Sequence, residues 1–185
     1  GAISFDGGNI TISNAKNNYT GATLVTSGSL TLGADGALGG TSELSLSAGT
    51  SFYLGGFDQT VQALIGSGTV VFGASDSVLT VSPTTLQSAT SIDNIFTGTS
   101  GTLKFENAGD LTFTNGANLA GSFTGTINLA GTSVDLTNSS TTTANIFTGT
   151  SLVLENGGSA DFGNGVGTSG RMSLKGLDLH SNAAI

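Results

Sequence analysis

The chain has 185 residues, of which 37% are apolar and only 9% are charged, with one proline, no cysteine and a formal net charge of −8. That length suits one domain or a section of a longer one, and so few charges do not suit a disordered chain kept expanded by self-repulsion. The acidic balance disfavours nucleic acid and anionic membranes as partners, and the lack of cysteine excludes disulfides and thiolate metal sites.

The remaining composition, rich in Thr, Ser, Gly and Asn, indicates β-structure with many tight corners. No apolar period of 3.6 residues runs over a long window, so only the segment 83–89, which opens with Pro83, is expected to form a single helical turn. No apolar run reaches about 18 residues, and we expect no membrane insertion by this segment. Because the chain starts Gly-Ala-Ile-Ser-Phe, without the features of a signal peptide, we interpret it as a piece of a longer product.

Short alternating apolar runs, separated by glycine-rich corners, follow one another from the first residues onward. Residues 2–5 and 9–12 form two such runs around the sequence Asp-Gly-Gly. Further runs lie at 24–25, 30–32, 44–46, 52–54, 70–72 and 78–81. Strands this short and this regularly spaced predict a sandwich, a barrel or a solenoid.

An internal repeat in the second half favours the solenoid. The sequence Asn-Ile-Phe-Thr-Gly-Thr-Ser at 94–100 recurs at 145–151, which is 51 residues later, and Phe-Thr-Gly-Thr at 123–126 lies between the two copies. The apolar triplets that follow the three copies start 24 and then 25 residues apart. A period near 24 residues with about three short strands per period predicts a right-handed parallel β-helix, with residues 1–185 as a single segment.

Alternation along each triplet predicts which side chains face the core. The outer two residues point one way and the middle residue the other, so Leu103 and Phe105 are expected inside and Lys104 outside. The middle positions are all polar and are expected to face water: Thr31, Ser45, Lys104, Thr112, Asn128, Asp135, Asp161, Ser173 and Asp178.

Residues 17–73 carry a family resemblance. The stretch contains Asn-Tyr-Thr-Gly-Ala-Thr from residue 18, Gly-Ser-Leu-Thr-Leu-Gly from 28, Gly-Ala-Leu-Gly from 36, Leu-Gly-Gly-Phe-Asp-Gln-Thr-Val from 54 and Leu-Ile-Gly-Ser-Gly-Thr-Val from 64. In order and spacing it resembles the passenger-associated transport repeat of Gram-negative autotransporters, the type V secretion proteins, as found in self-associating and diffusely adhering adhesins. Residues 90–185 share only the β-helix pattern, with their own Phe-Thr-Gly-Thr coils.

The resemblance implies an exported passenger β-helix, at the bacterial cell surface or outside the cell. It also implies a signal peptide upstream and a membrane-embedded barrel downstream, both outside this sequence. In such families the repeat assists secretion and carries no catalytic residue. We therefore carry no catalytic, cofactor-binding or metal-binding residue over from the family.

Two sets of residues are candidates for chemistry. His180, the one histidine of the chain, lies beside Ser181 and near Asp178, but a catalytic triad needs a buried acid to orient the ring, and we interpret His180 as a surface residue. Asp135 and Asp161 occupy equivalent positions in adjacent coils and are expected to stack about 4.8 Å apart. No basic residue lies at an equivalent position, so we interpret them as solvated carboxylates, with a calcium or saccharide contact as the alternative.

Threonines and aromatic residues are candidates for binding surfaces. Alternation places Thr124 and Thr126 outside, whereas in the other copies of the repeat it places the threonines inside unless a corner intervenes. Those threonines are Thr97, Thr99, Thr148 and Thr150. An ordered outward threonine ladder is therefore not expected. The aromatic residues at middle or corner positions are Tyr19, Tyr53 and Phe57, which we expect mostly to pack against corners.

The expected function is that of a structural or adhesive section of an autotransporter passenger that mediates cell-surface adhesion or self-association. Its expected partners are other copies of itself or a host receptor or glycan. One alternative is a secreted, toxin-like passenger that binds a host receptor. A second alternative is a β-helix enzyme acting on polysaccharide, which the scarcity of basic residues disfavours. We expect no enzyme activity and no cofactor.

Overall fold

The computed structural model describes residues 1–73, 75–85, 89–113, 123–135, 149–161, 176–180, 183 and 185. Across these ranges every regular element is a β-strand, and all strand pairs are parallel. The helical turn expected at 83–89 is not seen in its described part, because Thr84 and Thr85 form a bend and Ala89 begins a strand. Residues 86–88 lie outside the description. No helix in the described ranges has the length and apolarity to cross a membrane.

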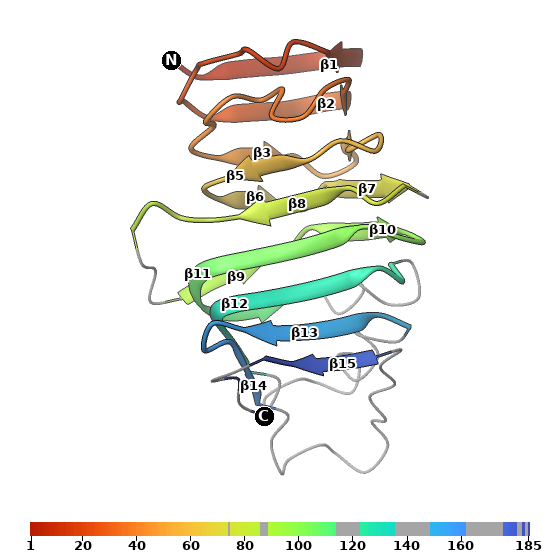
Figure 1. Ribbon diagram of the computed structural model, residues 1–185. Helices are drawn as coiled ribbons and strands as arrows, with labels where there is room; N and C mark the ends of the chain where they lie inside the picture. Colours follow the sequence, from red (N-terminus) through yellow and green to blue (C-terminus); the bar gives the residue numbers. More distant parts are fainter. Residues whose placement is uncertain are drawn as a thin grey trace.

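The strands stack one above another from the N-terminal end to the C-terminal end (Figure 1). In chain order they are β1 (Ile3–Ile12), β2 (Thr23–Leu32), β3 (Leu44–Leu46), β4 (Ser51–Tyr53), β5 (Gln59–Val61), β6 (Leu64–Gly66), β7 (Thr69–Gly73), β8 (Val78–Val81), β9 (Ala89–Ile92), β10 (Ile95–Gly98), β11 (Thr102–Phe113), β12 (Thr126–Asp135), β13 (Ser151–Glu155), β14 (Ser159–Asp161) and β15 (Gly176–Leu179).

The pairing arranges these strands on three faces of a parallel β-helix. The first face comprises the first halves of β1 and β2, then β3, β6 and β9, the second halves of β11 and β12, and β14. The second face comprises the second halves of β1 and β2, then β4, β7 and β10. The third face comprises β5, β8, the first halves of β11 and β12, β13 and β15. The predicted solenoid with about three short strands per coil is confirmed, for example by β3, β4 and β5.

Coil length changes along the molecule. Between consecutive coils Thr23 pairs with Ile3 and Leu44 with Thr23, which are offsets of 20 and 21 residues. From β11 onward the offsets are 24 and 25, because Thr126 pairs with Thr102 and Ser151 with Thr126. The expected period near 24 residues therefore describes the C-terminal coils, where the exact repeat lies, while the coils that include residues 17–73 are shorter.

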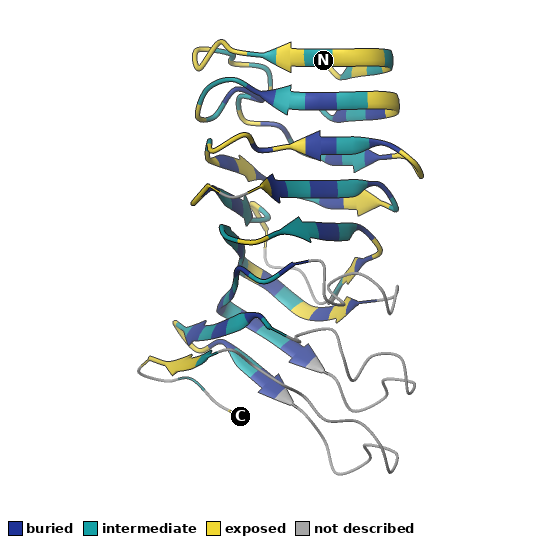
Figure 2. Ribbon diagram, turned by 90° about the vertical axis from the view of Figure 1, so that its right-hand side faces the viewer, coloured by how far each residue is buried: buried dark blue, intermediate teal, exposed yellow. Residues whose placement is uncertain are grey.

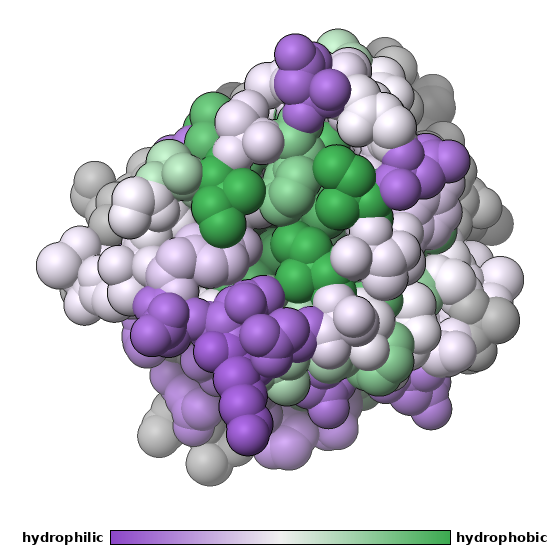
Figure 3. Space-filling model, turned by 90° about the horizontal axis from the view of Figure 1, so that it is seen from above, coloured by the Kyte–Doolittle hydropathy of each residue, from purple (hydrophilic) through white to green (hydrophobic). Residues whose placement is uncertain are grey.

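Alternating burial builds one continuous apolar interior (Figure 2). On β11, Leu103 and Phe105 are fully buried and Lys104 between them is half-buried, as predicted. Phenylalanines from successive coils fill the interior, and the ring centroids of Phe72 and Phe123 lie 4.9 Å apart. Seen from the N-terminal end, apolar side chains fill the centre and polar ones surround it (Figure 3). The predicted middle positions with described side chains are half-buried or exposed, and those of Asp135, Asp161 and Ser173 lie outside the description.

Glycine is required where corners of adjacent coils touch. Gly28 has a φ of 78°, and a Cβ built there would overlap the carbonyl oxygen of Gly8 in the coil above. Gly66 has the same relation to the carbonyl oxygen of Leu46. These glycines of the first coils therefore set the close approach of the backbone, which is a structural role.

Candidate functional site

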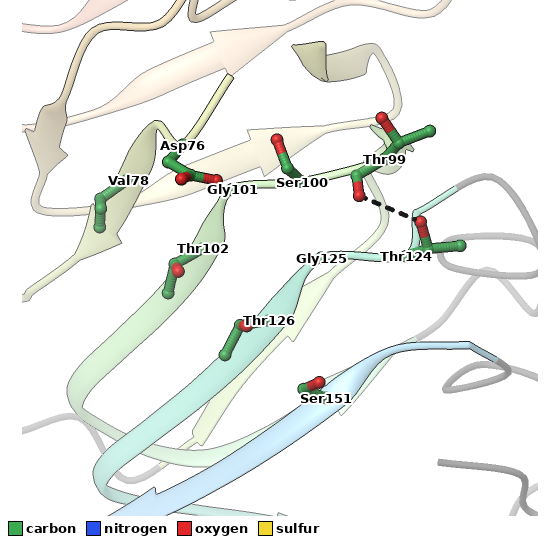
Figure 4. Close-up of a pocket in the computed structure, with 10 residues that line it drawn as sticks. All are labelled: Asp76, Val78, Thr99, Ser100, Gly101, Thr102, Thr124, Gly125, Thr126 and Ser151. Carbon is green, nitrogen blue, oxygen red and sulfur yellow. Dashed lines mark hydrogen bonds between the residues drawn. The ribbon is translucent and has the colours of Figure 1, made fainter. Parts of the chain in front are cut away.

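A polar groove of about 240 Å3 lies where the second face turns into the third. It crosses the ends of β8, β11, β12 and β13, so four successive coils contribute to it (Figure 4). The lining residues are Asp76, Val78, Thr99, Ser100, Gly101, Thr102, Thr124, Gly125, Thr126 and Ser151. Most of them carry a hydroxyl group, and Asp76 alone among them is charged.

Strand register stacks three of these hydroxyl-bearing residues in a row. Thr102 pairs with Thr126, and Thr126 pairs with Ser151, so the three lie one below another at the usual strand spacing of about 4.8 Å (Figure 4). Their backbone nitrogens donate to carbonyls of the coil above, at 2.8 to 3.0 Å. Their side chains are half-buried, and no hydroxyl among them bonds to another described group. They are available to donate to and accept from a ligand.

The opposite rim contains an unsatisfied polar atom. Thr124 Oγ1 donates to the carbonyl oxygen of Thr99 at 3.3 Å, which ties two neighbouring coils together. Ser100 Oγ is buried and has no hydrogen-bond partner in the described part of the chain. A buried hydroxyl without a partner is unfavourable unless water or a ligand satisfies it. Gly101 and Gly125 complete the groove, and a Cβ at Gly125 would overlap the carbonyl oxygen of Gly101.

The arrangement suits hydrogen bonding to a hydroxyl-rich ligand. Hydroxyl groups both donate and accept, and the carboxylate of Asp76 accepts. No described lining residue is a histidine, lysine or arginine, so Asp76 is the one ionisable side chain among them. The groove can therefore form hydrogen bonds with a hydroxyl-rich ligand along its length.

The sequence identified only part of this groove. Thr124 and Thr126 line it, as expected of outward residues. Thr99 was expected inside unless a corner intervened, and it is exposed, because the pairing register shifts after Thr97 and Gly98 has a φ of 137°. Thr97 is half-buried, Thr150 is buried as alternation predicted, and Thr148 lies outside the described residues. The corner at Gly98 thus turns Thr99 outward.

The histidine candidate has no catalytic surroundings among the described residues. His180 follows β15, and its Nε2 lies 3.3 Å from Asp178 Oδ2. Both side chains are well exposed, at 48% and 69%. An exposed carboxylate does not hold an imidazole in a fixed orientation, and Ser181 lies outside the description. The geometry agrees with a surface histidine.

The two candidate aspartates are paired residues on adjacent parallel strands. Asp135 of β12 pairs with Asp161 of β14, as their equivalent positions predicted. Their side chains lie outside the description. Elsewhere in the described ranges no three His, Cys, Asp or Glu side chains gather as a metal site would require.

An ion-pair cluster on the third face is a feature that we did not predict. Lys104 Nζ lies 2.7 Å from Glu106 Oε1 and 3.4 Å from Glu155 Oε1, which belongs to a strand two coils away. The hydrogen bond that Lys104 donates to Glu106 is the main reason why the pKa of Lys104 is raised. The register of β11, β12 and β13 places Glu106 and Glu155 in one row. In the sequence, Glu106 and Glu155 are separated by two coil lengths, which indicates that they lie in the same row.

The aromatic candidates differ in exposure. Tyr19 is partly buried, its hydroxyl lies 3.0 Å from Thr23 Oγ1, and burial raises its pKa. Phe57 packs against the core. Tyr53 on β4 is 40% exposed and points outward from the second face. Of the three, Tyr53 is therefore the most exposed.

Part of the chain is similar to a known protein. A stretch of 65 residues is 45% identical to the uncharacterized lipoprotein YdeK of Escherichia coli (strain K12). The stretch is 34% of this chain and 5% of that lipoprotein, so the chain spans a small part of its relative's length. No protein-family model matches the chain, and no solved structure matches it.

Proposed function

We propose that the chain is a structural and adhesive section of an autotransporter passenger, exported to the cell surface or beyond, where it mediates adhesion or self-association. The observation that carries this proposal is the hydroxyl-lined groove, which crosses four coils. The resemblance of residues 17–73 to the passenger-associated transport repeat supports the autotransporter assignment. The similarity of part of the chain to a lipoprotein supports a location in the cell envelope.

A rigid solenoid suits adhesion because it presents many weak contacts in fixed positions. One net hydrogen bond contributes only about 0.5–1.5 kcal/mol, so a single threonine binds little. Rows of hydroxyls repeated over successive coils, and many molecules on one cell, raise the effective affinity by multivalency. The net charge of −8 is spread along the molecule and is screened within about 8 Å at physiological ionic strength, so that like molecules are not kept apart.

The test is surface expression of the full-length parent protein in a bacterium that neither clumps nor adheres. The proposal predicts sedimentation of the cells by clumping, or binding of the cells to epithelial cells or extracellular matrix. A parent protein that reaches the surface, as shown by antibody labelling, and produces neither effect contradicts the proposal.

A further inference from the structure

We infer that a second groove, centred on Tyr53, binds a neutral glycan chain whose sugar rings stack on the tyrosine. This inference rests on the proposed function, because it names the class of ligand that an adhesive solenoid of this kind would hold. It concerns a site apart from the hydroxyl groove described above.

The Tyr53 groove is the larger of the two, with a volume of about 530 Å3, which lies in the usual range for small-ligand sites. It crosses the second face over the first four coils. The lining residues are Asn9, Ser29, Thr31, Tyr53, Gly55, Gly56, Val71, Phe72, Gly73 and Ser75. Register places Tyr53 between Thr31 of the coil above and Val71 of the coil below.

The tyrosine ring is accessible because the corner beside it has no side chains. Gly55, Gly56 and Gly73 all have positive φ values, which favour glycine at these corners. A Cβ built at Gly73 would meet no atom within 4 Å, so the space beside that corner is open. Tyr53 is 40% exposed and lines this space, so its ring is accessible to a ligand.

The polar groups around the ring match a sugar. Ser29 Oγ donates to Asn9 Oδ1 at 2.8 Å, which leaves the amide nitrogen of Asn9 as a donor, and Thr31 and Ser75 add hydroxyl groups. A sugar ring has an apolar C–H face, which packs on an aromatic ring, and a rim of hydroxyls, which need donors and acceptors. The groove offers both kinds of contact.

Charge favours a neutral glycan over an anionic one. No lining residue of the Tyr53 groove is charged, and the chain as a whole has a net charge of −8. A sulfated or uronic-acid glycan would meet no cation there, and moving its charges out of water against uncharged groups would cost free energy. A neutral hexose polymer meets neither obstacle.

Neighbouring residues of one corner of the solenoid line the two grooves. Ser75 lines the Tyr53 groove and Asp76, the next residue, lines the hydroxyl groove. Gly73 and Gly98 pair in adjacent coils at this same corner. A chain of several sugars that stacks on Tyr53 can therefore extend along the molecule toward Thr102 and Thr126, which favours an extended polymer as the ligand.

The experiment titrates the 185-residue protein with cellohexaose, chitohexaose and maltohexaose by calorimetry, with a heparin-derived hexasaccharide as the anionic comparison. We expect at least one neutral hexamer to bind more tightly than the heparin fragment. Tyr53→Ala should weaken that binding about tenfold through loss of the ring, and Tyr53→Phe should change it less than about threefold. Ile65→Ala is the matched control, because Ile65 is 42% exposed on a different face, and it should bind as the unmodified protein does.

The inference is overturned if no neutral hexamer binds, if the heparin fragment binds as well as or better than the neutral hexamers, or if Tyr53→Ala binds as the unmodified protein does. Circular dichroism and melting temperature establish that each variant is folded. Clumping or adhesion by cells that display the parent, together with no hexamer binding, would remove this inference and leave the proposed function standing. Hexamer binding without clumping or adhesion would leave this inference standing and remove the proposed function.

Discussion

Single polar residues hold this solenoid together where strand pairing stops. The first face is not hydrogen-bonded between β6 and β9, which end up in different sheets. Asn94, fully buried, donates from Nδ2 to the carbonyl oxygens of Ile65 and Gly68, each at 3.4 Å. Its side chain therefore replaces part of the missing pairing at the edge of β6.

Replacing Asn94 should destabilise the fold without touching either groove. Asn94→Ala removes the donor to the Ile65 carbonyl, while the Gly68 carbonyl still accepts from the Ile95 N–H, so we expect the free energy of unfolding to fall by about 1 kcal/mol. Urea denaturation followed by circular dichroism measures this. Asn18→Ala, at an exposed position, is the control and should change little. Equal stability of the two variants would show that Asn94 does not secure the edge of β6.

At the scale of the elements, corner glycines set how closely the coils stack. Gly28 and Gly49 have nearly the same φ, 78° and 79°, but a Cβ at Gly28 overlaps the Gly8 carbonyl and a Cβ at Gly49 meets nothing within 4 Å. Gly49→Ala should therefore cost about 1–2 kcal/mol from backbone strain alone, and Gly28→Ala about 3 kcal/mol or more. Thermal and urea unfolding compare the two. Similar losses of stability in the two variants would show that overlap with the Gly8 carbonyl adds nothing to the cost of backbone strain.

The ion pairs between strands of the third face predict a pH dependence. Glu106 raises the pKa of Lys104 above its ordinary 10.5, so the stabilisation is present below pH 10.5 and is lost as the pH rises through the raised value. Lys104→Met should lower the free energy of unfolding at neutral pH by up to about 1 kcal/mol, since these side chains are partly exposed. Well above pH 10.5 the variant and the unmodified protein should be equally stable.

Unfolding curves over a pH series, with and without added salt, measure this difference. Lys16→Met, at an exposed position away from this cluster, is the control and should show no such dependence. A Lys104→Met deficit that stays constant through the alkaline range would contradict an electrostatic cause.

The sequence predicted the strands better than it predicted the contacts between them. Alternation was enough to place Leu103, Phe105 and Lys104, because that pattern is local to one strand. The direction of Thr99 depends on a register shift after Thr97, and the contact of Lys104 with Glu155 depends on the register of three strands. Tyr53 is exposed because of glycines in two neighbouring coils, which a single run of sequence does not reveal.

At the scale of the whole molecule, the grooves and the apolar core follow from one pattern. Inward residues of each coil form the continuous interior, and outward residues of the same strands stack into rows on the surface. The rows of outward side chains therefore arise without any separate domain or inserted loop in the described ranges.

The adhesive role of the hydroxyl groove is tested most directly by altering that groove in the parent protein. Clumping and adhesion are then measured for cells that display the variant. The variant carries Thr102→Val, Thr126→Val and Ser151→Ala together, which removes the row of hydroxyls and keeps the shape of the side chains. Thr80→Val, half-buried on the same face and outside the groove, is the matched control. We expect the triple variant to reach the cell surface but to lose most of the clumping or adhesion. The control variant should clump or adhere as the unmodified protein does. Undiminished clumping and adhesion by the triple variant would contradict an adhesive role of the hydroxyl groove.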